Sequence, residues 1–172
     1  MPAGSTYTPI ATTTLGSAQS TVTFSSISSA YTDLVIVGNW GQSLDAEGCL
    51  IRVGNGSVDT GTNYSSTELY GTGSAAGSQR TSSATGARVT FASGGGSAVT
   101  SNFAIHLMNY ANTTTNKTMI TRANVPSSAY PATAATVSLW RSTSAINTIT
   151  LYLTGGNFLT GSTFTLYGIA SA

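Results

Sequence analysis

The sequence predicts an all-β protein, folded as a single-domain antiparallel β-sandwich of jelly-roll type. Charged helix formers are scarce, since the chain has a single lysine, Lys117, and two glutamates, Glu47 and Glu68. Thr, Val, Ile, Tyr and Phe dominate the stretches that look ordered, and these residue types favour strands. The stretches are short and are joined by turns of Gly, Ser, Asn and Asp, with no helical interval between them.

Each strand is inferred from apolar residues that alternate along the chain or form a short run. Pro9 predicts an edge or bulged first strand, because proline cannot donate to a sheet ladder. The near-continuous apolar run Thr32–Trp40 predicts a strand buried on both faces, whereas Cys49, Ile51 and Val53 alternate with more polar neighbours. The expected strands are Thr6–Thr14, Ser20–Ile27, Thr32–Trp40, Gly48–Val53, Asn63–Tyr70, Arg88–Ala92, Val99–Asn109, Lys117–Ala123, Thr133–Trp140, Ile146–Leu153 and Thr163–Ile169.

The length of 172 residues suits one domain, and neither an internal repeat nor a linker divides it. We expect residues 1–5 to form a flexible N-terminal arm. We expect residues 71–86, which are rich in Gly, Ser and Ala, to form a long surface loop. No apolar stretch approaches the roughly 18 residues that span a bilayer, and the N-terminus lacks a secretory signal, so no membrane partner is predicted.

Charge is the most unusual feature of the composition. Only 6% of the residues are Asp, Glu, Lys or Arg, and the formal net charge is +1. The basic residues are scattered, which argues against a nucleic-acid partner. One histidine and one cysteine cannot build a zinc site within one subunit, so neither a metal nor another cofactor is predicted. Cys49 lies beside Leu50 and Ile51, and we expect a buried, inert thiol, with an intermolecular bridge or a reactive thiol as the alternative.

The candidate catalytic groups do not combine into a recognisable site. His106 is out of phase with Phe103, Ile105 and Leu107, so it should point to the opposite face of its strand. Its expected role is a hydrogen-bonded or interface histidine, with catalysis as the alternative. The triplet that begins at Asp59 (DTG) matches an aspartic-protease signature, but it lies in a turn-like run.

The carboxylates could in principle pair for glycoside hydrolysis or bind calcium weakly. A position in solvated loops is the expected alternative, since nothing else in the sequence builds a site around them. The sequence therefore predicts a protein that is not an enzyme. The carboxylates considered are Asp33, Asp45, Glu47, Asp59 and Glu68.

Aromatic side chains are the remaining candidates for recognition. Trp40, Tyr110, Tyr130 and Trp140 fall at strand ends or in loops. Such residues could stack on sugar rings, as in a lectin, or could pack in the core or a subunit interface. We take Trp40, Tyr130 and Trp140 as candidate glycan or interface contacts.

Several stretches resemble small β-rich structural proteins of tailed bacteriophages, especially those of marine bacteria and cyanobacteria. Their order and spacing also match, so the resemblance covers most of the chain. The stretches are Phe24–Gly38 (FSSISSAYTDLVIVG), Asn55-Gly56, Asp59–Ser65 (DTGTNYS), Leu139-Trp140, Ser144–Ile149 (SAINTI) and Gly161–Ile169 (GSTFTLYGI).

This resemblance implies a virion component, assembled in the host cytoplasm and without catalytic residues. The expected role is a capsid decoration or cement protein that stabilises the head. The alternative is a tail fibre, spike or receptor-binding module that recognises host surface glycans. Many such proteins are trimers, so the expected partners are further copies of the chain in a homotrimer, and the major capsid protein or tail proteins. The chain lacks the N-terminal attachment or coiled-coil segment of longer fibre proteins, which favours decoration.

Overall fold

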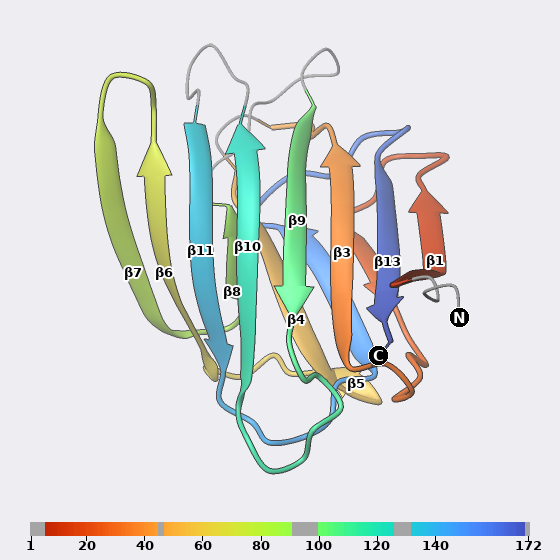
Figure 1. The fold of residues 1–172 in the computed structure, drawn as a ribbon. Helices are drawn as coiled ribbons and strands as arrows, with labels where there is room; N and C mark the ends of the chain where they lie inside the picture. Colours follow the sequence, from red (N-terminus) through yellow and green to blue (C-terminus); the bar gives the residue numbers. More distant parts are fainter. Residues whose placement is uncertain (1–5, 45–46, 91–99, 126–131, 171–172) are drawn as a thin grey trace.

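The computed structural model describes residues 6–44, 47–90, 100–125 and 132–170. The described chain forms thirteen strands in two antiparallel sheets, which confirms the predicted β-sandwich (Figure 1). The strands are β1 (Tyr7–Thr14), β2 (Thr21–Phe24), β3 (Asp33–Trp40), β4 (Cys49–Asn55), β5 (Ser57–Val58), β6 (Tyr64–Gly71), β7 (Ala76–Ala84), β8 (Ala87–Thr90), β9 (Ser101–Leu107), β10 (Lys117–Val125), β11 (Ala132–Trp140), β12 (Thr148–Leu153) and β13 (Thr163–Ile169).

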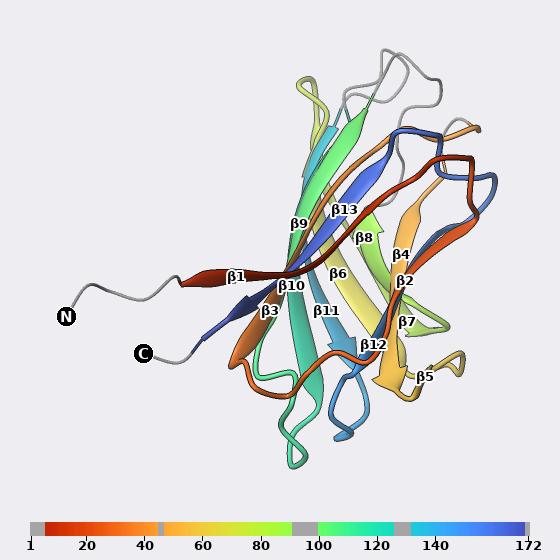
Figure 2. The same ribbon diagram turned by 90° about the vertical axis from the view of Figure 1, so that its right-hand side faces the viewer.

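The strand pairing has the nested pattern of a jelly roll. β1 pairs with β13 in the larger sheet and β2 with β12 in the smaller one; β3 then pairs with β9, and β4 with β8, again in alternate sheets. This is one long antiparallel hairpin wound into two layers, which are seen edge-on in Figure 2.

Two inserted hairpins widen the larger layer. Its strand order is β1-β13-β3-β9-β10-β11-β6-β7, so β10–β11 and β6–β7 extend it beyond β9. The smaller sheet has the order β2-β12-β4-β5, with β8 also paired to β4. The larger sheet therefore presents a broad outer face on the side away from the smaller sheet (Figures 1 and 2).

A single apolar core fills the space between the sheets, in keeping with one domain. Alternation places Cys49, Ile51 and Val53 in this core, as predicted. The Phe164 ring contacts two other phenylalanine rings at its centre, with centroids 6.2 Å from Phe103 and 5.0 Å from Phe158. Aromatic and β-branched side chains thus stabilise the core by packing, in a protein that has few ion pairs.

Two expectations are wrong. Residues 71–86 are not a long loop, because Ala76–Ala84 forms β7, which pairs with β6. The Gly-Ser-Ala sequence has weak strand propensity, but the backbone of β6 offers hydrogen-bonding groups to β7 whatever side chains β7 carries. Thr32–Trp40 is not buried on both faces, since Val37 and Asn39 on the outer face are exposed. The first strand matches its prediction, with an edge position and a register shift after Pro9.

Candidate functional surface

His106 lies on the outer face of β9, opposite the core side, as its phase predicts. Its Nε2 atom is 3.1 Å from Oδ2 of Asp33 on β3. The backbone N–H of Asn109 donates to the other oxygen of Asp33 at 2.7 Å. The Asp33 carboxylate thus links the end of β9 to the start of β3. The position of His106 is explained by this hydrogen bond on the sheet surface.

Asp59 organises the turn that precedes β6. Its Oδ1 accepts the backbone N–H of Gly61, and its Oδ2 accepts from Nδ2 of Asn63 and from Nε1 of Trp140, each at 2.8 Å. The Trp140 hydrogen bond is the largest cause that lowers the pKa of Asp59, with Asn63 and Gly61 adding to it against a smaller opposing effect of burial. The Asp-Thr-Gly triplet is therefore an Asx-type turn fastened to the core.

The four described carboxylates contact different partners in different places. Glu47 accepts from the hydroxyl of Thr154, Asp33 is paired with His106, and Asp59 lies in its turn. Glu68 is buried on β6, whereas Asp45 lies outside the described residues. Within the described ranges no group of three or more His, Cys, Asp or Glu side chains could hold a metal ion.

The two tryptophans are core residues. Trp40 is 1% exposed and its ring packs against Phe103, with centroids 5.2 Å apart, while Trp140 is 3% exposed. Neither ring can stack on a sugar in this conformation, so their expected glycan contacts are corrected to core packing. Tyr110 is also buried, and its hydroxyl donates to the carbonyl of Ser28. Tyr130, the third candidate contact, lies outside the described residues.

Cys49 is fully buried, and burial raises the pKa of its thiol. A thiol with a raised pKa is seldom present as the reactive thiolate, which fits the inert role expected for it.

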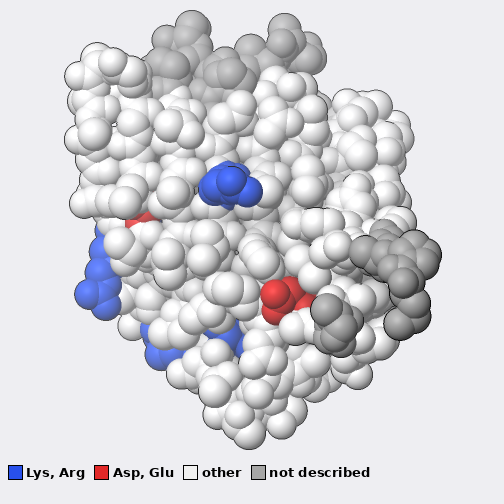
Figure 3. Space-filling view, viewed as in Figure 1, with Lys and Arg blue, Asp and Glu red and all other residues white. Residues whose placement is uncertain are grey.

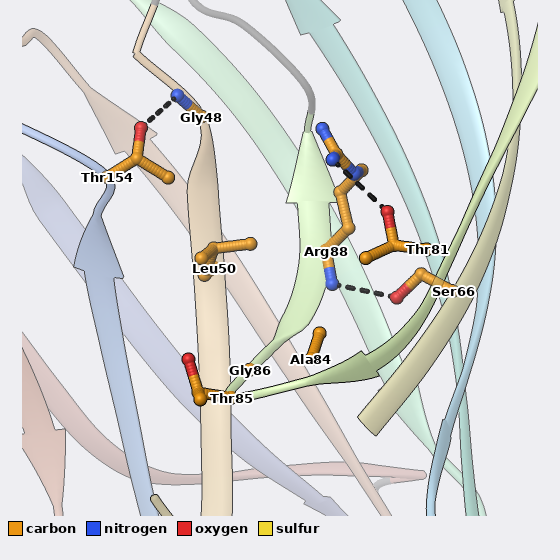
Figure 4. A pocket seen from close by; sticks show the side chains of 9 residues that line it. All are labelled: Gly48, Leu50, Ser66, Thr81, Ala84, Thr85, Gly86, Arg88 and Thr154. Atoms are coloured by element: carbon orange, nitrogen blue, oxygen red, sulfur yellow. Dashed lines mark hydrogen bonds between the residues drawn. The ribbon is translucent and has the colours of Figure 1, made fainter. Parts of the chain in front are cut away.

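A pocket of about 270 Å³ opens beside β8, between β4 and the β6–β7 hairpin (Figure 4). The Arg88 guanidinium lies in it, 3.4 Å from the Thr81 hydroxyl and 3.9 Å from the buried Glu68 carboxylate. The backbone N–H of Arg88 donates to Ser66 at 3.0 Å, and Gln79 donates to Glu68 at 2.6 Å. These contacts join β8 to the inserted hairpin, and the pocket lies at this junction. The pocket was not predicted from the sequence, because β7, which forms one side of it, was expected to be a loop.

The outer face of the larger sheet is the main surface that sequence analysis missed. Its apolar side chains adjoin one another across strands, because Ile120 pairs with both His106 and Val137. In the next row Val37 pairs with Ala104. Side chains directly opposite on paired strands lie about 5 Å apart. Five of the six exposed large apolar residues of the described chain, each between 44% and 62% exposed, lie on this face: Tyr7, Val37, Leu69, Ile120 and Val137.

Few charges interrupt this face. By the strand register, its charged or titratable side chains apart from tyrosine are Asp33, Arg80, His106 and Arg122. Arg80 lies on the edge strand β7, whereas Arg122 lies on β10 near the middle of the sheet. Figure 3 shows this face as largely uncharged, with one isolated basic group near its centre, further basic groups along its left and lower left edge and an acidic group at its lower right. Most of its other outward residues are uncharged Thr, Ser and Asn, so the exposed apolar side chains lie among neutral polar ones, a composition that suits a contact surface.

A scan of protein-family models found no match to this chain, and a search of curated proteins found no significant relative. The part of the chain that the structure describes contains no helix long and apolar enough to cross a membrane.

Proposed function

We propose that this chain is a non-enzymatic structural protein of a tailed-phage virion, and specifically a capsid decoration protein. The observation that carries the proposal is the broad, nearly uncharged outer face of the larger sheet, where Val37, Ile120, Val137 and Leu69 are exposed. A surface of this kind is suited to repeated packing against a neighbouring subunit, because few ions must be desolvated when it is covered. The sequence resemblance to phage particle proteins supplies the biological setting.

The jelly-roll fold also supports the proposal, since viral capsid proteins use this architecture, although lectins use it too. A decoration protein acts by mass action: it binds the assembled shell better than free subunits and so shifts the equilibrium toward the shell. A tail fibre or spike is the second candidate within the same class. Binding of glycans through stacked tryptophans is not proposed, because Trp40 and Trp140 are buried.

The proposal is tested by counting copies of the chain in purified particles of the phage that encodes it. Particles are separated from free protein on a density gradient, and peptides of this chain are quantified by mass spectrometry against those of the major capsid protein. A ratio that matches the capsid lattice supports a decoration protein, and a few copies per particle place it in the tail. Its absence from particles, while other virion proteins are recovered, refutes the proposal.

An add-back experiment then tests the stabilising role. Particles made without this chain should lose their DNA at a lower temperature than complete particles, and purified chain should restore the difference. A serum albumin added at the same concentration is the control for non-specific protection. Restoration that does not depend on this chain would contradict a cementing role.

A further inference from the structure

We propose that a second copy of this chain covers the outer face of the eight-stranded sheet. The inference deepens the proposed function by naming the partner, and it rests on that function for its purpose in the particle. The physical evidence for the contact is separate, and it comes from the apolar residues, the area and the charges of this one face.

On two strands of this face, an exposed apolar residue lies beside polar residues that point inward. On β11, Thr136 and Ser138 point inward and are buried, whereas Val137 between them points outward and is 56% exposed. On β6, Leu69 is likewise exposed while its neighbour Glu68 is buried. The buried Ser138 and Glu68 have partners within the sandwich, since Ser66 bonds Ser138 and Glu68 contacts Gln79 and Arg88, but the outward Val137 and Leu69 stay in water. A partner that covers the face would remove Val137 and Leu69 from water.

The area of the face matches the requirement of a stable protein contact. Eight strands spaced about 4.8 Å apart span about 34 Å, and seven residues at about 3.3 Å each span about 23 Å. The product is about 800 Å², which is close to the area that each partner contributes to a standard-size interface. The inserted hairpins β6–β7 and β10–β11 provide half of this width, because they supply four of the eight strands.

The charges favour a second copy over a strongly acidic or basic partner. Arg122 and Asp33 carry opposite charges on the same face, separated by one intervening strand between β3 and β10. A twofold axis that lies in the contact plane can place Arg122 of one copy against Asp33 of the other, twice in one interface. Identical patches related in this way are the common form of self-association, and here the arrangement brings Arg122 and Asp33 together as opposite charges.

The test is the mass of the purified full chain in solution, measured by light scattering and sedimentation from about 1 to about 100 μM, a range that resolves micromolar Kd values. The wild type should self-associate, and Val137→Glu or Ile120→Glu should weaken association at least about tenfold in Kd, because each buries a carboxylate. Leu44→Glu is the matched control: Leu44 is 50% exposed but lies off this sheet, in the loop after β3, and its variant should associate like the wild type.

A second measurement uses only the wild-type chain and so does not depend on the folding of a variant. Side-chain footprinting with a carbene probe should show that Ile120, Val137 and Leu69 become less reactive as concentration rises, while Leu44 does not. A chain that is monomeric at about 100 μM would overturn the inference. So would an oligomer whose outer-face residues stay reactive and whose mass is unchanged by both glutamate variants. Self-association without incorporation into particles would instead overturn only the proposed function.

Discussion

Replacement of Asp59 by alanine should destabilise the protein by removing the acceptor on which one turn depends. The substitution deletes three hydrogen bonds of 2.8 Å, and it leaves the indole N–H of the buried Trp140 without its partner. A net hydrogen bond contributes about 0.5–1.5 kcal/mol, and a buried unsatisfied donor costs about 1–3 kcal/mol. Since the turn is partly exposed, we expect the free energy of unfolding to fall by about 2–4 kcal/mol.

The measurement is urea unfolding, followed by tryptophan fluorescence and far-UV circular dichroism, with a thermal melt beside it. For a domain of this size, 1 kcal/mol corresponds to about 2–4 °C, so Tm should fall by about 5–15 °C. Thr60→Ala alters an exposed residue of the same turn and should stay within about 0.5 kcal/mol of the wild type. In a double-mutant cycle, Trp140→Phe should reduce the cost of Asp59→Ala, because the two share one hydrogen bond.

The same variant has a defined pH dependence. The pKa of Asp59 is lowered in the folded protein, so its contribution is complete above the unfolded pKa of about 3.9 and is lost as pH falls through the lower folded pKa. The stability difference between the wild type and Asp59→Ala should therefore be largest near neutral pH and should shrink below about pH 4. Equal stabilities at pH 7, or a difference that persists undiminished in strong acid, would refute this account of the turn.

Three further predictions concern the core. Phe164→Ala should cost about 3–5 kcal/mol in chemical unfolding, because the ring is fully buried, and a loss below about 1 kcal/mol would contradict its central position. Gly38→Ala should cost about 1–3 kcal/mol by overpacking, since its Cβ would lie 2.5 Å from the Phe103 ring, whereas Gly71→Ala has open space and should be tolerated. Cys49 should react with a thiol reagent only after unfolding, so rapid labelling of the native protein would show that it is accessible.

Alternation of apolar and polar residues within a strand was enough to predict most of the sandwich. It places Cys49, Ile51 and Val53 in the core and His106 on the opposite face from Ile105, as the structure has them. These predictions succeed because the two-residue period of a strand is a local property of the chain. The strand β7 could not be predicted in this way, because its existence depends on the hydrogen-bonding edge that β6 offers.

The candidate site was predicted less well, for reasons that differ between residues. The buried position of Trp40 was available from the sequence, since it is in phase with the inward residues Leu34 and Ile36. The apolar patch of the outer face could not be predicted from the sequence. Ile120 and Val137 lie on different strands, and in the sequence each is a single residue that breaks its strand's alternation. Only the pairing of β10 with β11 brings them side by side.

The scarcity of charge and the apolar outer face form one physical problem. A formal net charge of +1 gives little electrostatic repulsion between molecules, and an exposed apolar face in such a protein invites non-specific association. The edges of the larger sheet carry features that hinder strand pairing: β1 has Pro9 and a register shift, and β7 has Arg80. Between these edges the face carries few charged or titratable groups, among them Arg122 near the centre, with Asp33 and His106 toward one end. A chain that blocks both edges and leaves the face open directs its association to that face, which is why we assign self-assembly to it.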